Sequence, residues 1–121
     1  MNEESSLPLI MIVDDESKIR RIVAANLERA GYDVMSAADG IHALEIFARQ
    51  NPKPDLILMD VMMPEMDGFE CAQAIQNQSD VPFIFMTAKT DSSSKLKGFE
   101  LGADDYVCKP FSMEELLARI K

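Results

Sequence analysis

The chain has 121 residues, of which 47% are hydrophobic and 27% charged, and its formal net charge is −9 at pH 7. This length suits one domain with its own core, and the acidic balance argues against direct binding to nucleic acid or anionic lipid, because phosphate groups select basic surfaces. The longest apolar run, residues 7–13, is too short to span a membrane, and the first residues do not resemble a signal peptide, so we expect a cytoplasmic protein without membrane partners.

Apolar runs alternate with helical spacing along the chain. Short apolar runs predict strands at residues 7–13, 34–37, 56–59, 82–86 and 106–108. Apolar residues at helical spacing predict helices around residues 19–30, 43–47, 69–75, 96–99 and 113–120. Gly31, Asn51-Pro52 and Gly102 supply stop signals, and a capping box from Ser112 to Glu115 opens the last helix.

The alternation of strands and helices predicts an α/β fold. Strands joined through helices form a mostly parallel, doubly wound sheet that is covered on both faces. We expect residues 1–6 to be disordered and residues 7–121 to form the domain. The last helix reaches Lys121 without a stop signal, so we expect a piece of a longer protein whose output domain is absent.

Polar residues follow four of the predicted strands. Asp14-Asp15 follows the first strand, Asp60 the third, Thr87 the fourth and Lys109 the fifth. Because the carboxyl ends of parallel strands lie on one edge, these residues are expected to meet in one site. Clustered carboxylates suit Mg²⁺, a carboxylate can accept a phosphoryl group covalently, and a hydroxyl and an ammonium group can contact its oxygens.

Each of these residues alone has an ordinary structural explanation. Asp14 and Asp15 stand where a helix N-cap is expected, and Asp60 before a turn is typically solvated. Thr87 could be an ordinary loop hydroxyl and Lys109 a surface charge. Their joint occurrence at four strand ends favours the functional interpretation.

The stretches "IVDDE", "LILMDVMMPEMDGFE", "FMTAK" and "LGADDYVCKPFSMEELLARI" resemble a response-regulator receiver domain of two-component signal transduction. The resemblance covers Leu9 to Ile120 and is closest to receivers of winged-helix transcription regulators. It implies a flavodoxin-like fold with five helices and a five-stranded parallel sheet in the order 2-1-3-4-5. It also implies a signalling phosphoacceptor rather than an enzyme.

The resemblance also implies residue roles. Asp60 would be the phosphoacceptor, and Mg²⁺ would be held by Asp14, Asp15, Asp60 and the main-chain carbonyl of Met62. Thr87 would be the switch hydroxyl. Lys109 would pair with the phosphoryl group, and a cis Lys109-Pro110 bond would aim its side chain inward. Tyr106 matches the switch aromatic, although a half-buried strand tyrosine is an equal alternative. Gly68 would relieve a tight backbone after Asp67.

The implied partners are a sensor histidine kinase or phosphotransfer protein and, after phosphorylation, a second copy of the chain. The implied dimer face contains the charged residues Lys97, Asp104, Asp105 and Arg119, which could equally be plain solvated charge. The chain departs from the family at Cys108, where threonine or serine is frequent. Met62 and Lys89 occupy variable positions that influence dephosphorylation in the family.

Two other functions remain open on sequence alone. A haloacid-dehalogenase-like phosphatase also forms an aspartyl phosphate, but that family has a second aspartate where this chain has Met62. A receiver-like binding module that works without phosphorylation tends to lose the acidic residues that this chain keeps. The cysteines, Cys71 and Cys108, are expected to be packing residues, with a redox role as the alternative.

Overall fold

The computed structural model describes residues 7–87, 105–108 and 112–120. Its strands are β1 (Leu9–Val13), β2 (Asp33–Ala37), β3 (Leu56–Asp60), β4 (Phe83–Thr87) and β5 (Asp105–Cys108). Its helices are α1 (Ser17–Arg29), α2 (Gly40–Arg49), α3 (Gly68–Gln76) and α5 (Met113–Ile120). The helix predicted around residues 96–99 lies outside the described residues, as does the Lys109-Pro110 bond.

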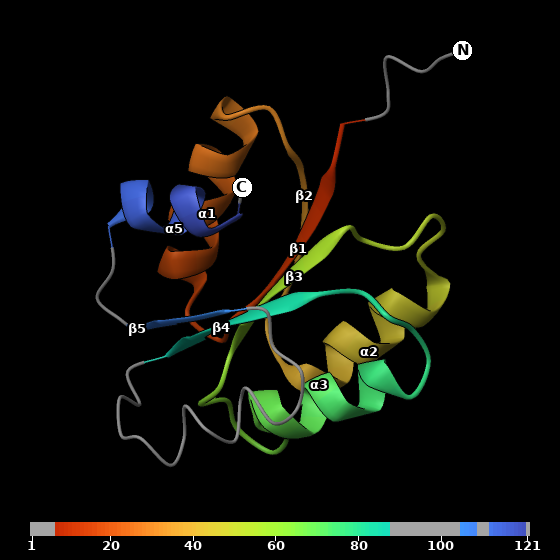
Figure 1. Cartoon of the computed structure of the whole chain (residues 1–121). Helices are drawn as coiled ribbons and strands as arrows, with labels where there is room; N and C mark the ends of the chain where they lie inside the picture. The colour runs from red at the N-terminus through yellow and green to blue at the C-terminus, as the bar shows by residue number, and fades with distance from the viewer. Residues whose placement is uncertain (1–6, 88–104, 109–111, 121) are drawn as a thin grey trace.

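The five described strands form one parallel sheet in the order β2-β1-β3-β4-β5. Helices α1 and α5 cover one face of this sheet, and α2 and α3 cover the other (Figure 1). The α/β class and the doubly wound parallel sheet are therefore confirmed. No helix in the described ranges combines the length and apolar character needed to cross a membrane.

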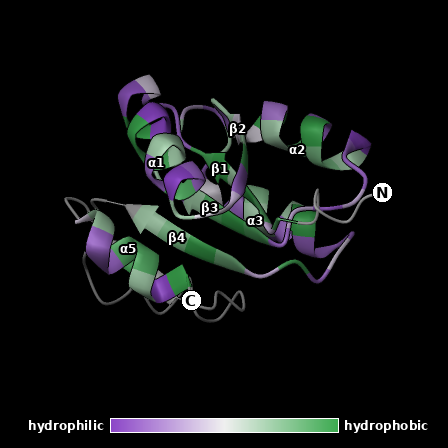
Figure 2. Ribbon diagram, turned by 90° about the horizontal axis from the view of Figure 1, so that it is seen from above, coloured by the Kyte–Doolittle hydropathy of each residue, from purple (hydrophilic) through white to green (hydrophobic). Residues whose placement is uncertain are grey.

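The core lies in two layers because successive side chains of a strand point to opposite faces. Met11 and Val13 of β1 face the layer of α2 and α3, whereas Ile10 and Ile12 face the layer of α1 and α5. Strand β3 divides in the same way. The apolar strands therefore occupy the centre, while polar residues of the helices lie outside (Figure 2). This two-sided burial explains why both strands read as continuous apolar runs.

The first strand is shorter than its apolar run predicts. Pairing with β2 begins at Leu9↔Asp33, and Leu7, which precedes Pro8, is 49% exposed. The predicted start at Leu7 is therefore wrong, because hydrophobicity alone does not mark where hydrogen-bonded pairing begins. The predicted helix stop at Gly31 is confirmed: α1 ends with the C-cap Ala30, and Gly31 follows with a φ of 101°.

Helix α5 begins as the capping signal predicts. Ser112 Oγ accepts a hydrogen bond from the main-chain N–H of Glu115 at 3.0 Å. This bond satisfies one of the donors that every helix N-terminus leaves without a partner in the helix. Oε2 of Glu115 also lies 3.7 Å from Nη2 of Arg119, one helical turn further along α5.

Candidate metal and phosphoacceptor site

Two buried carboxylates lie at the carboxyl edge of the sheet. Asp14 follows the last residue of β1, and Asp60 is the last residue of β3. The register Val13↔Met59 sets these two residues side by side on adjacent strands. Asp14 is 0% exposed and Asp60 is 4% exposed. Among the described residues, these two are the buried polar or charged ones. The alternative that Asp60 is an ordinary solvated residue before a turn is therefore wrong.

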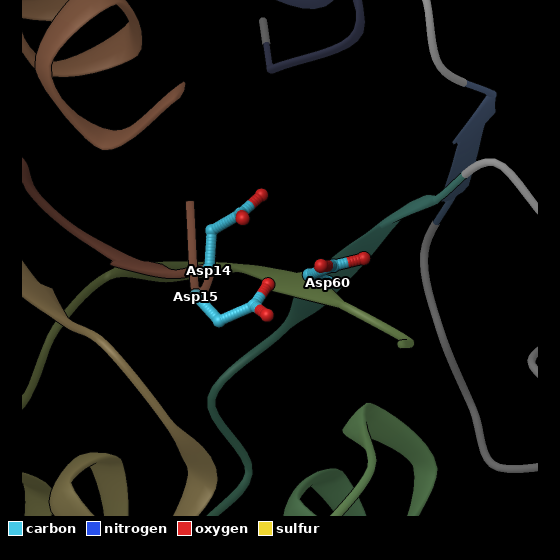
Figure 3. Close-up of side chains that lie close together, drawn as sticks. All are labelled: Asp14, Asp15 and Asp60. Atoms are coloured by element: carbon cyan, nitrogen blue, oxygen red, sulfur yellow. The ribbon is translucent and has the colours of Figure 1, made fainter. Parts of the chain in front are cut away.

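A third carboxylate completes the cluster. Asp15 is exposed, and one carboxylate oxygen from each of Asp14, Asp15 and Asp60 lies within 4.8 Å of the other two. Figure 3 shows the three side chains gathered where β1 and β3 end. The structure thus brings together three of the residues that the sequence analysis placed in one site.

Asp14 is held from three directions. Its N–H donates to the carbonyl oxygen of Ala37 in β2 at 3.2 Å, and its own carbonyl accepts from Arg20 Nη1 at 2.7 Å. Its carboxylate Oδ1 accepts from the N–H of Glu16 at 2.9 Å. The N-cap of α1 is Glu16, so the alternative that Asp14 or Asp15 serves as the N-cap is wrong.

The loop after Asp60 turns sharply against the end of β3. The N–H of Met62 lies 3.3 Å from Asp60 Oδ1, and the N–H of Gly68 donates to the carbonyl of Val61 at 2.8 Å. Glu65 in this loop has a φ of 68°, a left-handed conformation that is unusual for a residue other than glycine. The side chain of Met62 is 54% exposed.

Two features of the site were missed from the sequence. Asp67 and Glu70 form a reciprocal capping box at the start of α3, with bonds of 2.9 and 3.0 Å, and the D-x-x-E spacing was an available signal. No sequence pattern indicated the contact of Arg20, since its acceptor is the main-chain oxygen of Asp14 and every residue carries such an oxygen. Arg20 fixes the main chain at Asp14, and the capping box fixes the start of α3, where the Gly68 N–H donates to Val61, the residue after Asp60.

The other predicted site residues are described only in part. Thr87 is the last residue of β4 and pairs with Cys108 of β5, and Tyr106 lies on β5 opposite Phe85. Lys109 lies outside the described residues, as do Lys97, Asp104 and Lys89. Asp105 begins β5, and Arg119 is a half-exposed residue of α5. The predicted switch and dimer face therefore stay predictions.

The donor set fits a hard divalent cation. Mg²⁺ prefers carboxylate and carbonyl oxygens and is held by one or two carboxylates together with water and phosphate. Two of the three carboxylates are removed from water, so their mutual repulsion is weakly screened unless a cation lies between them. The residues present thus match the chemistry of a magnesium ion.

Comparison with known proteins agrees with this architecture. Residues 10–121 match the family model of the response regulator receiver domain. The chain is 52% identical over 112 residues to the probable transcriptional regulator ycf27 of Porphyridium aerugineum. This matched stretch covers 93% of this chain and 46% of that protein. It is 49% identical over 113 residues to the alkaline phosphatase synthesis transcriptional regulatory protein PhoP of Bacillus subtilis, again covering 93% and 46%.

Among solved structures, the chemotaxis protein CheY4 of Vibrio cholerae superimposes with a TM-score of 0.88 at 37% identity, over 94% of this chain and 96% of that one. The chain therefore belongs to the response regulator receiver domain family, the signal-receiving part of two-component systems. It spans about half the length of the curated relatives that it matches.

Proposed function

We propose that this chain is a phosphorylation-activated receiver that accepts a phosphoryl group on Asp60 from the phosphohistidine of a sensor kinase or phosphotransfer protein. The observation that carries the proposal is the pair of buried carboxylates, Asp14 and Asp60, on adjacent strand ends with Asp15 beside them. A carboxylate oxygen of Asp60 forms the new P–O bond as the P–N bond to the donor histidine breaks. The histidine nitrogen leaves with the electron pair of that bond and is neutral again.

Asp14, Asp15, Asp60 and the main-chain carbonyl of Met62 would hold Mg²⁺. The ion supplies positive charge that offsets the carboxylates and the phosphoryl oxygens. The Asp14 contacts to Ala37, Glu16 and Arg20 support this role, because they fix the main chain that carries the carboxylate. Lys109 would contribute a second positive charge at the phosphoryl group.

The phosphoryl group adds about −1.5 to −2 charges at the edge of the sheet. Thr87 would move toward it and donate a hydrogen bond, and Tyr106 would turn inward. These movements would shift the equilibrium of a two-state surface formed by the predicted fourth helix, β5 and α5. In a cytoplasmic transcription regulator, that surface would pair with a second copy and control an output domain.

The test is to incubate the chain with a small phosphodonor and Mg²⁺ and to weigh the intact protein. We expect a mass gain of one phosphoryl group that is lost in Asp60→Asn and when a chelator removes the metal. An equal gain in Asp60→Asn would overturn the assignment. Sustained release of phosphate from a generic ester would instead indicate the phosphatase, and metal binding without phosphorylation would indicate the binding module.

A further inference from the structure

Arg20 connects helix α1 to the metal-binding end of β1. It is the fourth residue of α1 and is half-buried, and its Nη1 lies 2.7 Å from the main-chain oxygen of Asp14. The described pairing of β1 with both of its neighbours ends one residue earlier, at Val13. The carbonyl of Asp14 therefore lies beyond the ladder pairs, and a charged side chain supplies it with a donor.

This contact determines more than the position of one carbonyl. The N–H of Asp14 is bonded to Ala37 and its Oδ1 to the N–H of Glu16, so the Arg20 bond fixes the peptide between these two contacts. Rotation of that peptide would change the direction in which the buried carboxylate points. Mg²⁺ demands near-ideal octahedral geometry and is therefore sensitive to such a change.

We propose that Arg20 is a positioning residue for the cation site: it holds the main chain at Asp14 so that the Asp14 carboxylate meets those of Asp15 and Asp60 in a geometry that binds a divalent cation. This inference rests on the proposed function, because it concerns the same metal. It goes beyond that function by assigning a role to a residue that does not touch the metal or the phosphoryl group.

The positive charge of Arg20 opposes Mg²⁺ binding, whereas its hydrogen bond to Asp14 favours it. A cation near the cluster disfavours a second cation, so loss of Arg20 through charge alone would tighten Mg²⁺ binding. That effect is screened by salt at a half-exposed side chain, whereas the hydrogen bond reaches the main chain of a residue that is 0% exposed. Positioning therefore outweighs repulsion, and loss of the bond weakens cation binding.

The experiment uses the full chain and the variants Arg20→Met, Arg20→Gln and Arg20→Lys, with Arg21→Met as the matched control. Met keeps the alkyl stem and helix propensity, Gln keeps a neutral donor, and Lys keeps a charged donor. Arg21 is the next residue of the same helix and is exposed. Calorimetric titration gives the Mg²⁺ dissociation constant at 0.1 M and about 0.5 M salt.

We expect Arg20→Met to weaken Mg²⁺ binding about 10-fold, the lower end of the effect of groups that orient metal ligands. Arg20→Gln and Arg20→Lys should recover part of this loss, and Arg21→Met should bind as the wild type does. The Mg²⁺ concentration for half-maximal phosphorylation should rise in parallel, while half-saturation by the phosphodonor stays constant. Thermal unfolding without metal shows whether each variant is folded.

Mg²⁺ binding by Arg20→Met at or above wild-type strength would overturn the inference. If Arg20→Met does not fold, Arg20→Gln decides: tighter binding than the wild type at low salt would show that charge dominates. Failure of the wild type to bind Mg²⁺ or to gain a phosphoryl group would overturn the proposed function instead. The two failures are therefore distinguishable.

Discussion

A Cβ atom on Gly68 would lie 2.2 Å from the main-chain oxygen of Asp60 and 2.8 Å from the Cα of Val61. The start of α3 thus rests directly on the backbone of the proposed phosphoacceptor. A glycine at this position is needed for the close approach of two main-chain segments, and it is not needed for an unusual φ. Only this approach lets the Gly68 N–H donate to Val61.

Gly68→Ala should therefore destabilise the protein by about 2–3 kcal/mol, because neither main-chain segment can rotate away from the added methyl group. It should also slow phosphorylation by displacing Asp60. Gly40→Ala is the matched control, since the three atoms nearest to its Cβ would all belong to the side chain of Met66 and not to main chain, the nearest being Sδ at 3.0 Å. Urea unfolding measures both variants, and equal stabilities would contradict the prediction.

Glu65→Gly should stabilise the protein. The left-handed φ of 68° costs a residue with a Cβ about 1–2 kcal/mol, whereas the extra chain entropy of glycine in the unfolded state costs about 0.4–1 kcal/mol. The difference predicts a net gain of up to about 1.6 kcal/mol in the free energy of unfolding. The same substitution at Glu45, an exposed residue of α2, should instead destabilise by about 0.5–1 kcal/mol. A loss of stability in Glu65→Gly would refute this account of the loop.

The single histidine of the chain makes stability depend on pH. Asp39 Oδ1 accepts from the N–H of His42 at 2.7 Å, and Oδ2 lies 3.0 Å from Nδ1. These hydrogen bonds lower the pKa of Asp39, and the side-chain bond with Asp39 raises the pKa of His42. The stability that the raised pKa of His42 contributes is fully present below the ordinary pKa of 6.5. It is lost as the pH rises through the raised pKa of the folded protein. The contribution of Asp39 is lost only as the pH falls below its ordinary 3.8.

His42→Gln should consequently reduce stability more at about pH 5.5 than at about pH 8.5, although the pair is exposed and the effect is small. Urea midpoints of the wild type and the variant at both pH values give the comparison. A difference between the two proteins that does not change with pH would show that the ion pair contributes nothing.

Cys71 should be chemically inert in the folded protein. It is 0% exposed, its Sγ lies 3.6 Å from the carbonyl of Gly40, and burial raises its pKa to about 12. In a Cys108→Ser background, a thiol reagent at neutral pH should label Cys71 only as fast as the protein opens. Labelling without added denaturant at the rate of an unstructured thiol would support the redox alternative for this residue.

Local patterns determine a large part of this molecule. The apolar runs that become β1 and β3 are buried on both faces, and such runs are typical of central parallel strands. Because the carboxyl ends of parallel strands share an edge, the convergence of Asp14 and Asp60 followed from their positions after two such runs. The capping box of Asp67 and Glu70 had an equally local signal that went unused.

Other features depend on contacts between segments that do not neighbour each other in the chain. Leu7 is as apolar as the residues of β1 but remains outside that strand, since strand pairing decides where a strand starts. The role of Arg20 depends on a carbonyl that becomes available only where the pairing of β1 ends. The need for glycine at position 68 comes from the backbone of Asp60 across the loop.

The sequence by itself therefore determined the α/β class and the identity of the three clustered carboxylates, because periodicity and strand ends are encoded within a few residues. Only the tertiary structure decided how those carboxylates are held. Asp14 is held by main-chain groups of Ala37 and Glu16 and by the side chain of Arg20, and each of these contacts depends on how the segments pack.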